Sequence, residues 1–228
     1  MITKQLTLIT FLVALVYTVV RYGYFKGVSV ADFPLYLMNK ATAISGLLLF
    51  GLAGLQANST KRLHTGLSAL ALIFIHVMSS LVLLSEDYFE VFYDSVNKQM
   101  AWNTQISMLS GILAFTCVLI LLRATDNGKS DHAFSLVPGL GRWGLVLVFL
   151  HMVFMATDHW ITPEQWPGNM PPITLISALI CIIFCLLHLE EIKGACLEPR
   201  CHTLFHWNTT STMTDHTRTS PVPTPFPR

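Results

Sequence analysis

Residues 63–84 read LHTGLSALALIFIHVMSSLVLL, an apolar run whose one ionisable side chain beyond the first turn is His76. As an α-helix, a run of this length spans roughly 30 Å, the thickness of the hydrocarbon core of a bilayer. Irregular backbone cannot face lipid, because its N–H and C=O groups would lack partners there. The run therefore predicts a transmembrane helix with a histidine inside the membrane.

Five further runs of similar length and composition lie at about 5–25, 33–55, 102–122, 141–158 and 171–190. In the whole chain of 228 residues, 53% are hydrophobic and 12% are charged, which is half the charged share of an average soluble domain (about 25%). No alternating pattern of membrane strands appears. We therefore expect an all-α fold, a six-helix transmembrane bundle, in a multi-pass protein of the cell membrane, and of the inner membrane if the source is bacterial.

The Lys and Arg residues of the short loops predict the sidedness of the bundle, because such residues collect on the cytoplasmic side. On the side of the N-terminus fall Lys4, Lys61, Arg62, Arg123, Lys129, Arg142, Lys193 and Arg200. The opposite, outer side holds only Arg21, Lys26 and Lys98. Both termini are therefore expected to be cytoplasmic. The 14 Lys and Arg nearly balance the 13 Asp and Glu, so we expect membrane lipid, and no nucleic acid, as a partner.

The composition changes near residue 194. Residues 1–193 are expected to form the transmembrane domain, and residues 194–228, rich in Thr, Ser and Pro, a polar, disordered cytoplasmic tail. The soft metal ligands of this tail are Cys196, Cys201, His202 and His206. Their spacing matches no standard zinc pattern, so a zinc site is the less favoured interpretation. The cysteines inside the apolar runs are interpreted as packing residues.

Three ionisable side chains lie inside the predicted membrane spans, where their insertion is costly and suggests a function: Lys40, His76 and His151. At 1.5 Å per residue, His76 lies about 12 Å from the outer end of its run, and His151 and Lys40 about 10 Å. A b-type haem needs two imidazoles from facing helices at one height as axial ligands, and Lys40 would offset a haem propionate. The alternatives are histidines that only pack and form hydrogen bonds, and a lysine that extends to the headgroups.

Arg21, at the outer end of the first run, is a further candidate for a propionate partner. The inner part of the fifth run holds no histidine, so one haem b is expected. A second haem between His64 and His188, near the cytoplasmic ends of their runs, is the less favoured interpretation. Pro138 is interpreted as a helix start, where proline is tolerated.

Four stretches together carry a resemblance to a known family: LYLMNK at 35–40, KRLHTG at 61–66, GLVLVFLH at 144–151 and WITPEQWPGNMPP at 160–172. They resemble the ferric reductase-like transmembrane domain, the haem-binding six-helix unit also found in NADPH oxidases and in bacterial sulfoxide-reductase haem subunits. The last stretch is similar to that of a small bacterial single-domain subgroup.

The resemblance implies an oxidoreductase, or the haem subunit of one, that transfers electrons through haem b, with His76 and His151 as axial ligands of the iron. The resemblance does not imply ferric iron as the acceptor, because the family name covers several acceptors, but reduction of ferric iron at the outer face is one expected activity. The sequence holds no Gly-rich dinucleotide fingerprint, so electrons would come from a quinol or a separate flavin reductase. The alternative is a non-enzymatic transporter or structural membrane subunit, whose histidines relay protons or pack.

Overall fold

The computed structural model describes residues 2–85, 92–94, 98–126 and 131–197. The chain divides into two compact units, Met1–Leu189 and Glu190–Arg228, and the first holds the membrane spans. In the second unit, only the last turns of the sixth helix lie within the described residues. Residues 194–197 of the predicted disordered tail are helical and belong to this helix, whereas residues 198–228, with Cys201, His202 and His206, lie outside the described residues.

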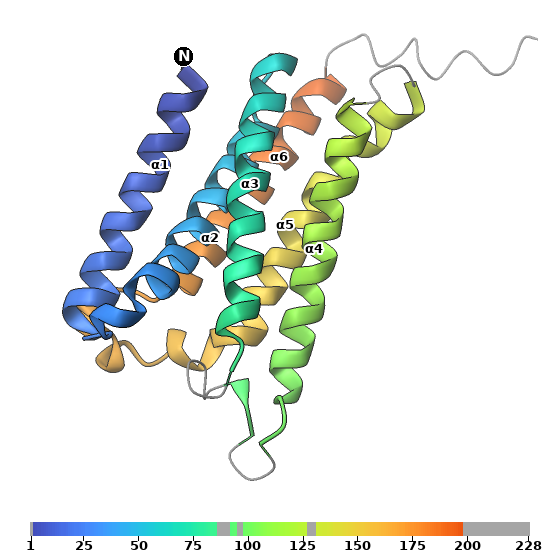
Figure 1. Cartoon of the computed structure of the whole chain (residues 1–228). Helices are drawn as coiled ribbons and strands as arrows, with labels where there is room; N and C mark the ends of the chain where they lie inside the picture. The colour runs from blue at the N-terminus through green and yellow to red at the C-terminus, as the bar shows by residue number, and fades with distance from the viewer. Residues whose placement is uncertain (1, 86–91, 95–97, 127–130, 198–228) are drawn as a thin grey trace, which may run out of the picture. The chain divides into compact units, whose positions relative to one another are not determined.

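Six long helices make up the part of the chain that the structure describes (Figure 1). They are α1 (Ile2–Thr18, continued by the π-helix η1, Val19–Phe25), α2 (Phe33–Gly54), α3 (Ser59–Leu83), α4 (Trp102–Asp126), α5 (Asp131–Trp160) and α6 (Ile173–Leu197). Each is long and apolar enough to cross a membrane. Extended backbone pairs only at an isolated bridge between Tyr93 and Met100 within these ranges. For the described residues, the prediction of an all-α fold with six helices able to span a membrane is confirmed, and the sidedness stays a prediction.

Successive helices run in opposite directions, so the segments that join them alternate between the two ends of the bundle (Figure 1). Residues 26–32, 84–85, 92–94, 98–101 and 161–172 lie at one end, which we call the outer end after its predicted location. His76 is seven residues from the outer end of α3, and His151 is nine residues from the outer end of α5. At 1.5 Å per residue, these positions differ in depth by only about 3 Å.

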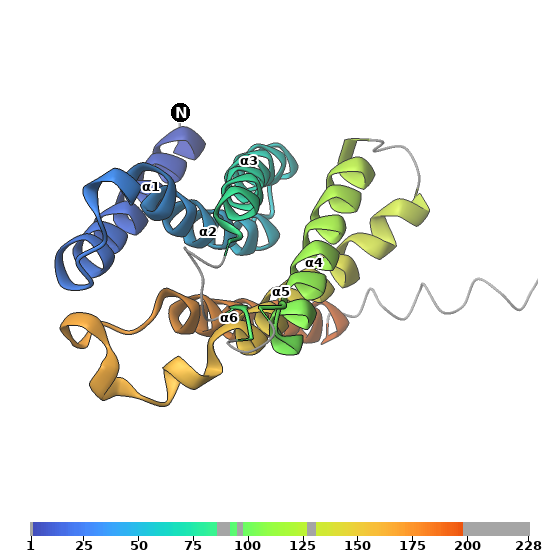
Figure 2. The same cartoon turned by 60° about the horizontal axis from the view of Figure 1, so that its bottom comes forward.

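The helix α2 is the most enclosed of the six, and it lies between α1 and α3 in both views (Figures 1 and 2). Of its most apolar stretch 61% is buried, compared with 33% or less in the other spans. Small side chains allow this, because close helix packing in a membrane depends on small residues at the interface. The small residues buried on α2 are Ala41, Thr42, Ser45, Gly46, Gly51 and Ala53.

The most extensive helix contacts are within two pairs, α2 with α3 and α4 with α5, whereas the contacts between the pairs are sparse. The helix α6 packs against α2 at two glycines, since a Cβ atom at Gly51 would overlap the ring of Phe184 and one at Gly54 would overlap the ring of His188. Each of these two pairs carries one of the histidines predicted inside the membrane, His76 on α3 and His151 on α5.

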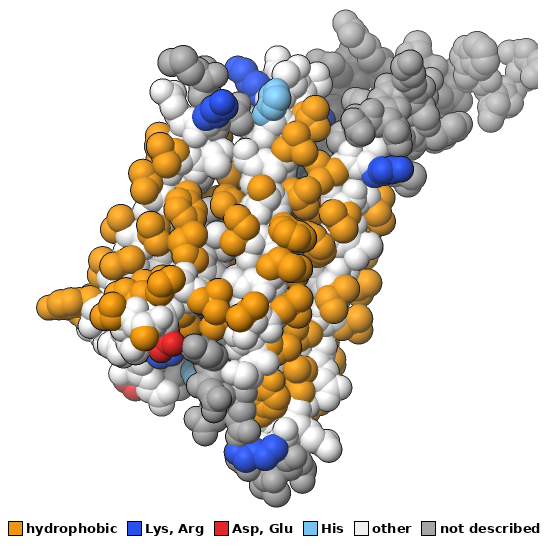
Figure 3. Space-filling view, in the orientation of Figure 1, with side chains coloured by type: hydrophobic (Ala, Val, Ile, Leu, Met, Phe, Trp, Pro, Cys, Tyr) orange, Lys and Arg blue, Asp and Glu red, His pale blue; other side chains and the backbone are white. Residues whose placement is uncertain are grey.

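Apolar side chains cover the sides of the helices, and most of the Lys and Arg side chains in view lie toward their ends (Figure 3). On α1, for example, Leu8, Ile9, Val13 and Val16 are each more than half exposed. A water-soluble protein rarely exposes so large a contiguous apolar surface, whereas lipid tails are a suitable solvent for it. The surface therefore agrees with lipid contact along all the spans in view.

Two local features differ from a regular helix. The end of α1 widens into the π-helical turn Val19–Phe25, a form that often occurs at functional positions. The interpretation of Pro138 as a helix start is wrong, because α5 begins seven residues earlier, at Asp131. Proline inside a helix removes one backbone hydrogen bond and kinks the axis, and the first turns of α5 are bent away from the rest (Figure 1).

We predict that Gly51→Ala lowers the stability of the bundle by about 1–3 kcal/mol, because the added methyl group forces the Phe184 ring and α6 away from α2. Gly66→Ala is the matched control, since no atom of another helix lies within 4 Å of its added Cβ. We expect this variant to gain up to about 1 kcal/mol of stability. Thermal unfolding in detergent measures both. Equal effects of the two variants would show that α6 does not depend on Gly51.

Candidate functional site

His76 is held by a polar group of the neighbouring helix α2. Its Nδ1 atom lies 2.6 Å from the side-chain oxygen of Asn39 and 3.2 Å from the backbone oxygen of the same residue. The amide nitrogen of Asn39 donates to the hydroxyl of Ser80 at 3.0 Å, which turns the amide oxygen toward the imidazole. Asn39 is only 2% exposed, so this network lies in the interior between α2 and α3.

His151 is held in the same way by the helix α4. Its Nδ1 atom lies 2.7 Å from the backbone oxygen of Ser107, and the hydroxyl of Ser107 donates to the backbone oxygen of His151 at 2.8 Å. Ser107 is fully buried. Gly111, one turn further along α4, lets the ring lie against the helix, because a Cβ there would be 3.1 Å from Nδ1.

These partners fix the tautomer of both rings. The closest partner of each Nδ1 is an oxygen that can only accept, so each Nδ1 carries the proton and donates it. In a neutral imidazole the other nitrogen, Nε2, then carries the free lone pair. Among the described residues, every hydrogen bond of the His76 and His151 side chains is made through Nδ1. Both rings thus keep the nitrogen that binds metals available.

The two imidazoles and Lys40 lie in one electrostatic environment. The charges of His151 and Lys40 act on His76, and the charge of Lys40 acts on His151. The Lys40 ammonium lies 5.4 Å from the centre of the Tyr36 ring, one turn earlier on α2. Both histidine rings are partly buried. The structure therefore brings three of the four predicted site residues together in the outer half of the bundle.

Arg21, the fourth predicted residue, has a different environment. The residue is 5% exposed, and its guanidinium lies 5.3 Å from the centre of the Tyr22 ring, beside the apolar cluster that α1, α2 and the start of α6 form. Its electrostatic neighbours among the described residues are tyrosines, Tyr17, Tyr22 and Tyr36. Its assignment as a propionate partner stays a prediction.

The residues considered for a second haem are at the opposite end of the bundle. His64 is exposed in the second turn of α3, and the ring of His188 packs on Gly54 of α2. A second haem between them stays a prediction. Within the described ranges, no three or more His, Cys, Asp or Glu side chains come together as a metal-binding group.

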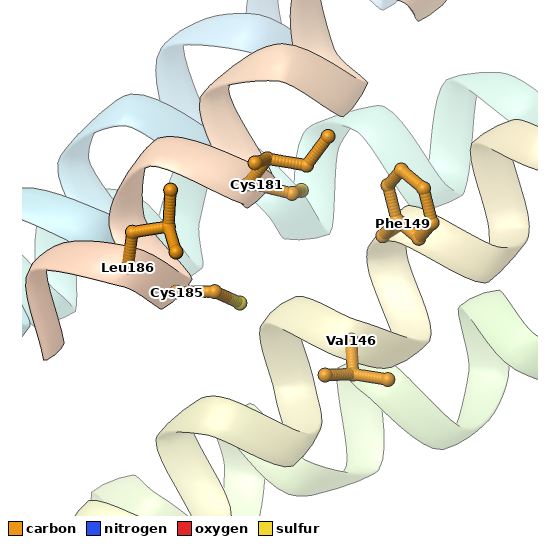
Figure 4. A pocket seen from close by; sticks show the side chains of 6 residues that line it. Val146, Phe149, Cys181, Cys185 and Leu186 are labelled. Atoms are coloured by element: carbon orange, nitrogen blue, oxygen red, sulfur yellow. The ribbon is translucent and has the colours of Figure 1, made fainter. Parts of the chain in front are cut away.

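Two cavities lie between neighbouring helices of the bundle. One, of about 150 Å³, lies between α5 and α6 and is lined only by apolar side chains and two thiols (Figure 4). Its residues are Val146, Phe149, Cys181, Ile182, Cys185 and Leu186. No charged side chain lines it, so it offers little to orient a polar ligand, and both cysteines are free thiols within apolar packing.

The second cavity, of about 300 Å³, opens at the outer end between the start of α4 and the end of α5. Polar groups line it here, and they include Asn103, Asp158 and His159. Its lining on α5 begins at Val153, two residues beyond His151, and includes neither imidazole.

Sequence reasoning found the imidazoles and missed the groups that hold them, Asn39 and Ser107. A usable signal was present, since both are polar residues inside apolar runs at the depth of the histidines, seven and six residues from the outer ends of their helices when the first residue is counted as one. Serine and asparagine in membrane helices are also ordinary packing residues. Only the rotation of α2 and α4 about their axes shows that these two side chains face an imidazole.

Comparison with known proteins adds nothing to this geometry, because no family model, curated protein or solved structure matches the chain. The resemblance to the ferric reductase-like transmembrane domain therefore stays a prediction. What the fold and the site define is a multi-pass membrane protein that holds two imidazoles at one depth, each with its Nδ1 proton donated to a neighbouring helix.

We predict that Asn39→Leu destabilises the cofactor-free protein by about 1–3 kcal/mol, because it removes the side-chain acceptor at 2.6 Å and leaves the Nδ1–H of His76 only the longer contact with the backbone oxygen of residue 39. The double variant Asn39→Leu/His76→Leu should cost at least about 1 kcal/mol less than the sum of the two single variants, since it removes both partners of the bond. Thermal unfolding of the four proteins measures the coupling. Strictly additive costs would mean that the two side chains do not depend on each other.

Proposed function

We propose that the chain is a haem b-binding subunit of a membrane oxidoreductase, in which His76 and His151 supply the two axial ligands of the iron. When bound, the haem supplies one-electron redox chemistry. The protein would provide ligation, an apolar environment and nearby positive charge. Electrons would pass within the membrane or across it to an acceptor at the outer face, such as ferric iron.

One observation carries this proposal: both imidazoles donate from Nδ1 to a neighbouring helix and leave Nε2 without a hydrogen bond among the described residues. Histidines that bind metals almost always use their second ring nitrogen in this way, which fixes the orientation of the ring and raises its basicity. A haem brings its own four equatorial nitrogen atoms, so two imidazoles are a sufficient set of protein ligands.

The surrounding groups support the same proposal. The two pairs α2–α3 and α4–α5 each hold one imidazole rigidly, and few contacts join the pairs. Lys40 acts electrostatically on both rings and would offset the negative charge of a propionate. The outer cavity between α4 and α5, with Asp158 and His159 on its wall, would let a cationic or metal-containing acceptor approach the site.

Spectroscopy of the full chain, produced with a supply of haem and purified in detergent, tests this function. We expect a Soret band, a low-spin reduced-minus-oxidised difference spectrum, and one haem per chain in a pyridine haemochrome assay. His76→Ala and His151→Ala should each lose more than about 90% of the bound haem, because either change removes an axial ligand.

His64→Ala and His188→Ala are the matched controls, since they remove histidines at the opposite end of the bundle. Both variants should keep the full haem content. A haem count that falls from two to one in these controls would instead indicate the second site. A folded wild-type protein that stays colourless would contradict the proposal and favour the transporter or structural subunit, whose histidines relay protons or pack.

We predict that Lys40→Gln keeps the haem but lowers its midpoint potential by about 20–60 mV, at 59 mV per factor of ten for a one-electron couple. Reduction adds a negative charge at the iron, and a nearby ammonium stabilises that reduced state. Lys61→Gln, an exposed change at the inner end of α3, should leave the potential unchanged. A spectroelectrochemical titration measures both, and equal shifts would remove Lys40 from the site.

A further inference from the structure

The guanidinium of Arg21 is a buried cation whose charge is not neutralised by any described residue. The side chain is 5% exposed, and its Nε and Nη1 atoms are buried without a hydrogen-bond partner within the described ranges. The guanidinium carbon lies 5.3 Å from the centre of the Tyr22 ring, but a phenol brings no negative charge. Unpaired donors on a buried charge are rare, because desolvating them is expensive.

The residues around Arg21 tie the outer end of the first span to two neighbouring segments. Arg21 lies in the π-helical turn Val19–Phe25 at the outer end of the first span. Tyr17, one turn earlier, donates to the backbone oxygen of Pro171 at 2.5 Å, which ties α1 to the segment before α6. Tyr22 and Tyr36 meet edge to face with their centres 5.7 Å apart, which joins the turn to α2.

A second cation lies on the exposed side of the same tyrosines. The Lys26 ammonium donates to the hydroxyl of Tyr36 at 3.3 Å and lies 6.0 Å from the centre of the Tyr22 ring. Lys26 is exposed, whereas Arg21 is buried. The two positive charges and the phenol hydroxyls thus form a cluster that donates hydrogen bonds and carries a net positive charge.

The position of the cluster in the span points to the kind of ligand. Arg21 is four residues from the end of a span whose Val19, Val20 and Phe25 side chains are exposed and apolar. This is the depth at which phospholipid headgroups meet the hydrocarbon core. An anion held there by an arginine gains strong charge-assisted hydrogen bonds, because the guanidinium presents several N–H groups.

We propose that Arg21, assisted by Lys26, binds an oxyanion at the outer end of α1, α2 and α6. The phosphate of a membrane phospholipid and a propionate of the haem offer the same chemistry. The haem source rests on the function proposed above, and the lipid source does not.

The test compares ligands that differ only in the oxyanion, using the delipidated full chain in an uncharged detergent. Phosphatidylglycerol is compared with diacylglycerol of the same acyl chains, and haem is compared with its propionate dimethyl ester. With ligand at about 100 times its dissociation constant, the melting temperature should rise by roughly 5 °C or more, and the partner that lacks the oxyanion should give little of this rise.

Three variants test whether the ligand-induced rise in melting temperature depends on Arg21. Arg21→Gln should melt at the wild-type temperature or above it without ligand, because it removes an uncompensated buried charge, and it should lose most of the ligand-induced rise. Arg21→Lys keeps the charge and should keep part of the rise. Arg123→Gln is the matched control, because it removes an exposed arginine at the inner end of α4, away from Arg21. This variant should behave as wild type.

The two sources give different results. A rise with phosphatidylglycerol that persists in His76→Ala identifies the lipid phosphate, even if the chain binds no haem. A rise with haem that its dimethyl ester fails to give, and that requires Arg21, identifies the propionate.

The proposal is overturned if Arg21→Gln responds to both ligands as wild type does, or if it destabilises the ligand-free protein by several degrees, as a purely structural arginine would. If Arg21→Gln does not fold, the wild-type comparisons and Arg21→Lys decide. Equal rises in melting temperature with the ligands that carry the oxyanion and those that lack it would then overturn the proposal.

Discussion

A protonated nitrogen inside a bilayer has no water to donate to, and this constraint determines how both membrane histidines are held. Each imidazole donates its Nδ1–H to an oxygen on the other helix of its own pair, His76 to Asn39 of α2 and His151 to Ser107 of α4. A ring fixed in this way can rotate little without losing the bond. Each helix pair therefore acts as a rigid holder for one imidazole, and the relative position of the pairs sets the relation between the rings.

The helix α2 connects this site with the rest of the fold. Its small residues let α3 approach closely and let the Phe184 and His188 rings of α6 lie on Gly51 and Gly54. Its consecutive residues Asn39 and Lys40 serve two purposes. Asn39 accepts from His76, while Lys40 places its charge near both imidazoles. The packing that makes α2 the most buried span thus also orients the polar groups, so a change in its contact with α6 should be felt at the site.

The sequence predicts the spans well because length and hydropathy alone decide whether a helix can cross a bilayer. It also predicts the shared depth of His76 and His151, since depth follows from counting residues along a helix. It does not predict the direction of side chains such as Asn39, Ser107 and Arg21. A span that is apolar on every side carries no periodic signal for its rotation, and tertiary packing alone determines which residues face inward. The helix start at Asp131, before Pro138, was missed because proline is common in the first turn of helices.

A histidine that serves only packing should use both ring nitrogens, because a nitrogen lone pair left without a donor in an apolar environment is costly, at about 1–3 kcal/mol. In this protein His76 and His151 both satisfy Nδ1, and neither Nε2 has a hydrogen bond among the described residues. One such ring is a local defect that a membrane protein tolerates. Two rings that leave the same nitrogen without a hydrogen bond, at the same depth and near one lysine, are the arrangement that the proposed shared ligand would require, because it would accept both lone pairs.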